Sequence, residues 1–223
     1  MPGVPPPPDF GRANLEIETI SPGRTFGRIY WSTYPDPLGY GKSPSRFSDP
    51  RRRVDANRFG VLYLGDSLKV CFLETVLRDR REGILDDLPV EEVELTRRRY
   101  AEIATTADLR LVDLRGDNAV RMGVPTDVVR AQRQNLARRW SLAFHEHPSE
   151  PDGVIYPSRA QRGDQSRHLR PGDTEASAEA RFDTSRRAGA GSGSGGFQGG
   201  VGVKMQHVSV SLDEDGCSAR IVH

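Results

Sequence analysis

The chain has 223 residues, and its 32 basic and 31 acidic side chains give a net charge of +1 at pH 7. This balance argues against direct, non-specific nucleic-acid binding, and the lack of a run of about 18 apolar residues excludes a membrane-spanning helix. The two cysteines, Cys71 and Cys217, are too few for a disulfide scaffold or a cysteine-based zinc site.

Residues 1–20 include four consecutive prolines, which favour an extended and solvated backbone. We therefore expect a disordered, proline-rich arm that adds nothing to the core. The start of the chain lacks the basic and apolar regions of a secretory signal, so a cytoplasmic location is expected.

The next part of the chain predicts strand, loop, strand and helix. Thr25 to Tyr34 is rich in aromatic and β-branched residues, which suits a strand, and the prolines and glycines of Tyr34 to Pro50 predict a long loop. The apolar run Phe59 to Leu64 predicts a buried strand. Apolar residues at helical spacing then predict a helix over Ser67 to Arg80.

Two more strands are expected at Val90 to Leu95 and at Leu109 to Leu114. The most regular apolar stripe predicts a helix over Thr126 to His145, which Pro148 would end. The run Gly153 to Tyr156 predicts another buried strand.

The character of the sequence changes after Ser158. Gln161 to Arg187 is mostly charged and polar, and glycine takes eight of the sixteen positions over 187–202. Such a composition predicts a loose loop or disorder. A short strand is expected near Val208 to Leu212. The predicted organisation is thus the arm 1–20, a domain over 21–186 and a poorly ordered, glycine-rich tail over 187–223.

Five polar residues lie in or beside the apolar runs, where a core would not favour them. They are Arg28, Arg46, Tyr63, Glu74 and Ser158. Taken singly, each also fits an ordinary solvated or structural position. Glu74 is the most informative, because its helical neighbours are largely apolar, and a buried carboxylate must be paired or have its pKa raised. A surface pair between Glu74 and Arg78 remains the alternative.

Other candidate sites are weaker. The sequence His145-Glu146-His147 resembles a metal-binding pair, but neighbouring positions on a helix point apart. The chain has no HExxH, CxxC or GxxxxGK motif and no serine in a GxSxG turn. No metal site is predicted.

The motifs RIYWSTYPDPLGYG, SRFSDP, FGVLYLGDS, CFLETVLRD and DGVIYPSR follow one another in this order over about residues 24–160. This order resembles the RES family, which is named for arginine, glutamate and serine. The resemblance implies an α+β fold, similar to the ADP-ribosyltransferase core, with a mixed β-sheet and flanking helices around a cleft for NAD.

The resemblance also implies the roles of the five residues. Glu74, Ser158 and Arg46 correspond to catalytic residues, and Arg28, Arg46 and Tyr63 to residues that bind NAD. Tyr40 is expected to approach the same cleft.

In function, the resemblance implies a toxin of a bacterial toxin–antitoxin pair that degrades NAD as a phosphorylase or glycohydrolase. NAD would be the substrate and phosphate a co-substrate, with no further cofactor. The partner would be an antitoxin with a helix-turn-helix DNA-binding part. ADP-ribosyl transfer to a protein, a catalytically decayed binding protein and homo-oligomer formation stay open.

The chain departs from the family pattern after Ser158. Members usually continue with a further apolar strand, of which only Ala180-Arg181-Phe182-Asp183 remains here. The sequence therefore does not predict which strand closes the sheet.

Overall fold

A computed structural model describes residues 3–51, 58–77, 80, 90–130 and 134–158, and the backbone of 176–182 and 201–204. The strands are β1 (Ile17–Ile20), β2 (Thr25–Trp31), β3 (Gly60–Gly65), β4 (Arg98–Thr105), β5 (Leu109–Asp113), β6 (Gly153–Pro157), β7 (Ala176–Phe182) and β8 (Val201–Lys204). The helices are the 3-10 turn η1 (Phe10–Arg12) and the α-helices α1 (Leu68–Thr75), α2 (Glu92–Thr96), α3 (Asn118–Arg121), α4 (Asp127–Arg130) and α5 (Asn135–His145).

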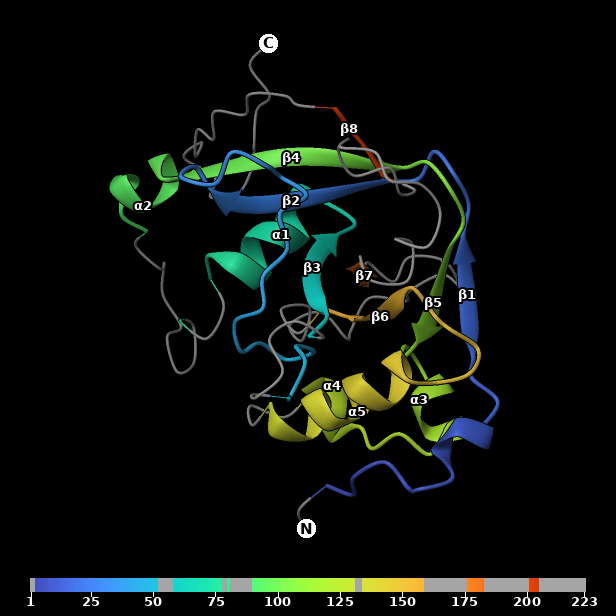
Figure 1. The fold of residues 1–223 in the computed structure, drawn as a ribbon. Helices are drawn as coiled ribbons and strands as arrows, with labels where there is room; N and C mark the ends of the chain where they lie inside the picture. Colours follow the sequence, from blue (N-terminus) through green and yellow to red (C-terminus); the bar gives the residue numbers. More distant parts are fainter. Residues whose placement is uncertain are drawn as a thin grey trace, which may run out of the picture.

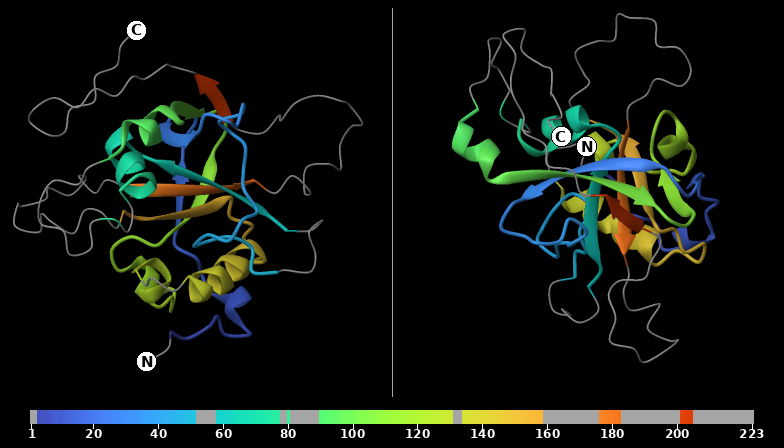
Figure 2. Two further views of the ribbon diagram at one scale, coloured as in Figure 1. Left: turned by 90° about the vertical axis from the view of Figure 1, so that its left-hand side faces the viewer. Right: turned by 90° about the horizontal axis from the view of Figure 1, so that it is seen from above.

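The strands form one mixed sheet in the order β1-β5-β6-β7-β3-β2-β4-β8. The pair β5–β6 is parallel, and the other neighbouring pairs are antiparallel. Helices α3, α4 and α5 gather below β6, while β2 and β4 lie at the top and α1 between (Figures 1 and 2). This is the α+β class that the sequence predicts.

Successive residues of β5 and β6 point to opposite faces of the sheet, as the pleat requires. Val112 and Val154 belong to a core with Trp140 and other side chains of the helices. The neighbouring residues Leu111 and Ile155 belong to a second core on the other face. Both faces of these strands are thus covered, which explains their nearly continuous apolar sequence.

Strand β7 occupies the interior of the sheet, between β3 and β6. Ala178 faces Leu64 of β3 on one side and Ile155 of β6 on the other. The further strand that the family pattern requires is therefore present, and it includes Ala180, Arg181 and Phe182 of the remnant.

The predicted disorder of residues 1–20 is wrong for the described residues from 3 onward. Strand β1 pairs with β5, and Phe10 is buried against Trp140, with ring centroids 4.9 Å apart. The Trp140 Nε1–H also donates to Val4 O at 3.0 Å. The sequence therefore concealed an aromatic side chain and a backbone hydrogen bond that hold this segment against α5.

The prediction of a strand at Val90 to Leu95 is also wrong. Residues Glu92–Thr96 form α2, and the next strand is β4, which starts at Arg98 and pairs with β2. Burial alternates along β4, and its charged residues occupy the more exposed positions. The arginines at the start of β4 concealed this alternation in the sequence.

Two further predictions need smaller corrections. The helix expected over Thr126 to His145 is described as two helices, α4 and α5, with residues 131–133 outside the described part. The tail contributes β8 at Val201–Lys204, next to β4, although half of the preceding stretch is glycine. Residues 208–212 lie outside the described part. In the described ranges, no helix has the length and apolar character needed to span a membrane.

Candidate active site

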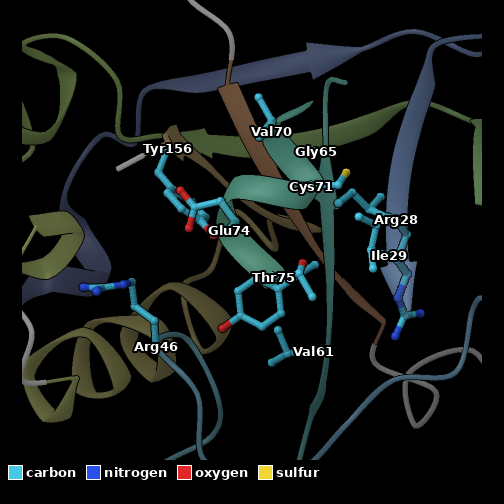
Figure 3. Close-up of a pocket in the computed structure, with 12 residues that line it drawn as sticks. Arg28, Ile29, Arg46, Val61, Gly65, Val70, Cys71, Glu74, Thr75 and Tyr156 are labelled. Atoms are coloured by element: carbon cyan, nitrogen blue, oxygen red, sulfur yellow. The ribbon is translucent and has the colours of Figure 1, made fainter. Parts of the chain in front are cut away.

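A cavity of about 340 Å³ lies between β3, α1, β2 and residues 45–49, which we call the Arg46 loop. Its walls are formed by Arg28, Ile29, Arg46, Val61, Tyr63, Leu64, Gly65, Val70, Cys71, Glu74, Thr75 and Tyr156. Figure 3 shows Glu74 near the centre, with Arg46 and Arg28 on opposite sides. Four of the five predicted residues therefore line one cavity, and the fifth, Ser158, contacts it through Glu74.

Glu74 is placed by helix α1. The Ser67 hydroxyl caps the N-terminus of this helix by accepting a hydrogen bond from Val70 N at 3.2 Å. The helix also packs closely on the end of β3, since a Cβ at Gly65 would lie 2.8 Å from Cys71 Sγ. A residue larger than glycine at position 65 would clash with the Cys71 thiol and crowd Val70 on the helix that carries Glu74.

The side chain of Glu74 is half-buried and meets Ser158, which follows β6. Ser158 Oγ donates to Glu74 Oε1 at 2.6 Å, although the two residues are 84 positions apart in the sequence. This short bond orients one carboxylate oxygen. Arg78, the partner of Glu74 in the alternative surface pair, lies outside the described residues.

Arg46 is buried at 4% exposure, on the side of the cavity nearest α4. Its Nη1 donates to Val128 O at 3.3 Å. Arginine side chains stay positively charged in proteins, so this wall of the cavity is positive.

Tyr63 contacts the Arg46 loop through its hydroxyl group. The hydroxyl donates to Ser45 Oγ at 2.9 Å and accepts a hydrogen bond from Phe47 N at 3.2 Å. The ring of Tyr63 lines the cavity. The hydroxyl of Tyr63 therefore contacts the loop, while its ring offers a flat surface on which a ligand in the cavity can lie.

Arg28 projects from β2 at the opposite side of the cavity. Its Nη1 donates to Pro37 O, and its Nη2 donates to Gly39 O at 2.7 Å. Burial lowers the pKa of Arg28 to about 10, which leaves the guanidinium cationic at neutral pH. Tyr40 is 37% exposed and covers Gly60 at the start of β3, and it is not among the residues that line the cavity.

Sequence reasoning missed several residues around the cavity. Tyr156 and Cys71 line it, and both belong to apolar runs that read as ordinary core. Burial raises the pKa of the Cys71 thiol to about 12, so it stays protonated and is a poor nucleophile. No local pattern distinguishes these two residues from their apolar neighbours.

The arrangement combines two guanidinium groups with a carboxylate between them. Guanidinium groups bind phosphate groups through paired, charge-assisted hydrogen bonds, and a carboxylate stabilises a nearby positive charge. A ligand that carries both phosphates and a cationic centre fits this pattern. Within the described ranges, no three His, Cys, Asp or Glu side chains gather as metal ligands would.

Comparison with known proteins agrees with the sequence motifs. The profile of the RES domain matches residues 22–188. The probable toxin y4kH of Sinorhizobium fredii is 39% identical over 83 residues, which cover 37% of this chain. This alignment spans 65% of the length of the relative.

A solved structure with a similar fold is that of the MbcT–MbcA toxin–antitoxin complex of M. tuberculosis. The matching chain superimposes with a TM-score of 0.51 over 73% of this chain and 76% of its own length. The sequence identity is 18%, so this likeness concerns the fold alone.

Proposed function

The chain belongs to the RES domain family, and we propose that it is an enzyme that consumes NAD by cleaving the bond between nicotinamide and ribose. The observation that carries this proposal is the position of Glu74, which lies in the cavity between Arg28 and Arg46. NAD combines a negatively charged pyrophosphate with a cationic nicotinamide ring. The cavity offers the opposite charge to each: guanidinium groups for the pyrophosphate and a carboxylate for the cationic part.

The residues have the following roles in this proposal. Arg46 and Arg28 hold the pyrophosphate, and the ring of Tyr63 holds the nicotinamide or its ribose. As the C1′–N bond breaks, its electron pair moves to the nicotinamide nitrogen, which becomes neutral, and positive charge develops on the ribose. The Glu74 carboxylate stabilises that charge, and its bond from Ser158 keeps it in place.

An oxygen nucleophile then completes the reaction. Attack by phosphate forms a bond from a phosphate oxygen to C1′ and yields a phosphorylated ADP-ribose. Attack by water yields ADP-ribose and releases a proton. We favour phosphorolysis or hydrolysis over transfer to a protein side chain, and NAD and phosphate are then substrates rather than cofactors.

The biological role that we propose is that of a toxin acting in the cytoplasm, neutralised by an antitoxin with a helix-turn-helix DNA-binding part. The name of the Sinorhizobium relative and the complex formed by the structural neighbour support this role. Expression in a bacterial host should arrest growth and deplete NAD, and co-expression of a small protein encoded next to this gene should restore growth.

The direct test measures NAD loss by the purified protein, with and without phosphate, and identifies the products by mass spectrometry. Glu74→Ala should lower the rate by about 100-fold or more while the protein stays folded. The exposed Glu91→Ala serves as the matched control and should keep the wild-type rate. Near-wild-type turnover by folded Glu74→Ala would contradict the role of Glu74.

The same assay separates the alternatives. Labelled protein in a lysate supplied with labelled NAD would instead indicate ADP-ribosyl transfer. NAD binding without any turnover would indicate a binding protein.

A further inference from the structure

Helix α5 holds the Arg46 loop at two carbonyl groups, one on each side of Arg46. Arg138 Nε donates to Ser45 O at 2.9 Å, and Ser141 Oγ donates to Phe47 O at 2.5 Å. Arg138 and Ser141 are three residues apart, so they lie on the same face of the helix. Neither is among the residues that line the cavity.

The hydrogen bond between Ser141 and Phe47 is shielded from water. Ser141 and Phe47 are both fully buried, at 0% exposure. A buried carbonyl or hydroxyl that loses its partner has no water to replace it, so the bond between them strongly favours one position of the loop. Tyr63 of β3 also contacts the loop, through its bonds to Ser45 and Phe47.

We propose that Ser141 and Arg138 are positioning residues for the reaction at the cavity. By holding the backbone before and after Arg46, they determine where its guanidinium meets the substrate. The inference rests on the proposed function, because it acts through the contact between Arg46 and NAD. It extends the site to α5, a helix that has no residue in the cavity wall.

The size of the expected effect follows from how strongly enzyme activity depends on the position of the groups that bind the substrate. A displacement of about 1 Å in a substrate-binding group lowers activity by up to roughly 100-fold. Ser141→Ala should therefore lower kcat/KM for NAD by about 10-fold or more, mainly through KM, because Arg46 is assigned to the pyrophosphate. Arg138→Lys retains the charge but loses the Nε donor, and it should act in the same direction.

A double-mutant cycle tests whether the effect passes through Arg46. If Ser141 acts only by placing Arg46, then adding Ser141→Ala to Arg46→Ala should change kcat/KM by less than about twofold. The control is Arg139→Ala, an exposed arginine next to Arg138 on the same helix, which should match the wild type. If Ser141 had a purely structural role, the double variant would instead lose kcat/KM by the product of the two single-variant factors.

Hydrogen exchange tests the loop contact independently of catalysis. The amide of Phe47, which donates to Tyr63, should exchange faster in Ser141→Ala and in Arg138→Lys than in Arg139→Ala. Unchanged exchange in both folded variants, or additive losses in an active enzyme, would overturn the positioning role. Faster exchange in a protein that consumes no NAD would overturn the proposed function, and with it the catalytic part of this inference, while the loop contact itself would stand.

Discussion

The Arg28 guanidinium donates to two loop carbonyls, Pro37 O and Gly39 O, from a half-buried position beside the cavity. Lysine carries the same charge but presents it at one point, and it cannot reproduce two bonds in the plane of a fork. A ligand with a pyrophosphate would lose a paired contact in the same way.

We therefore predict that Arg28→Lys weakens NAD binding by about 10-fold. Calorimetric titration in a Glu74→Ala background measures binding without turnover. Arg24→Lys is the matched control, since its side chain is 57% exposed. Equal NAD affinities for Arg28→Lys and the control would show that Arg28 only holds the loop at Pro37 and Gly39 and does not bind NAD.

Asp49 closes the Arg46 loop by accepting five hydrogen bonds at its carboxylate, four from Arg51 and one from Phe59. Burial raises the pKa of Asp49, but these bonds, mainly from the Arg51 side chain, outweigh it and hold the pKa below its ordinary value. A carboxyl with a lower pKa in the folded state stabilises the protein above its unfolded pKa, and this contribution is lost as the pH falls through the folded pKa.

Asp49→Asn should thus lower the free energy of unfolding by about 1–3 kcal/mol at pH 7. The difference from the wild type should shrink below the ordinary carboxyl pKa of 3.8. Urea unfolding at pH 7 and pH 3 measures both values, with the exposed Asp108→Asn as the control. A loss that is the same at both pH values would show that the charge of Asp49 is not responsible.

At the scale of elements, Phe10 is the buried aromatic side chain of the N-terminal segment. Phe10 packs on Trp140, Phe144 and His147, with ring centroids 4.9, 5.7 and 5.8 Å away. His147 also contacts the segment, with its Nε2 3.1 Å from Ala13 O. These contacts join η1 to α5 and to the turn that follows it.

Phe10→Ala should lower the free energy of unfolding by about 3–5 kcal/mol, because it leaves a cavity among large aromatic rings. Val4→Ala removes a side chain from the same segment at 66% exposure and should have little effect. Chemical denaturation of the two variants provides the measurement. A loss below about 1 kcal/mol for Phe10→Ala would mean that the segment contributes little to the core.

For the whole molecule, the sheet separates two cores, and the cavity lies on the face that carries the helices. Val61 and Tyr63 point to this face from β3, whereas Leu62 and Leu64 belong to the opposite core. Strand β7 connects β3 to β6, so it links the strand that carries Tyr63 to the strand that precedes Ser158. The folding unit must therefore extend beyond Ser158.

We predict that Ala178→Pro unfolds the protein or costs at least about 3 kcal/mol, because proline removes a ladder hydrogen bond within an interior strand.

Replacement of residues 188–200 by a short flexible linker should leave the melting temperature and NAD consumption close to wild type, since every residue of the site precedes residue 160. Thermal melts and the NAD assay check both variants. Unfolding of the linker variant would place part of that stretch in the folding unit.

The sequence alone was sufficient for features that depend on near neighbours and for the family motifs. The apolar runs of β3 and β6 identify buried strands, Ser67 identifies the start of a helix, and Glu74 stands out against its apolar face. All five candidate residues stand in or beside apolar runs, and the motifs of the RES family implied their roles; the structure brings them together at one cavity.

Only the tertiary structure decided which distant groups meet. The pairing of Ser158 with Glu74 spans 84 positions, and the bond from Ser141 to Phe47 spans 94. Phe10 is buried although its neighbours are prolines and polar residues, and β4 is a strand although its first residues are arginines. The spacing of apolar residues shows which face of a segment will be buried. Whether Phe10 is buried or β4 forms a strand depends on the distant segment that covers that face. Only the folding of the whole chain brings that segment into place.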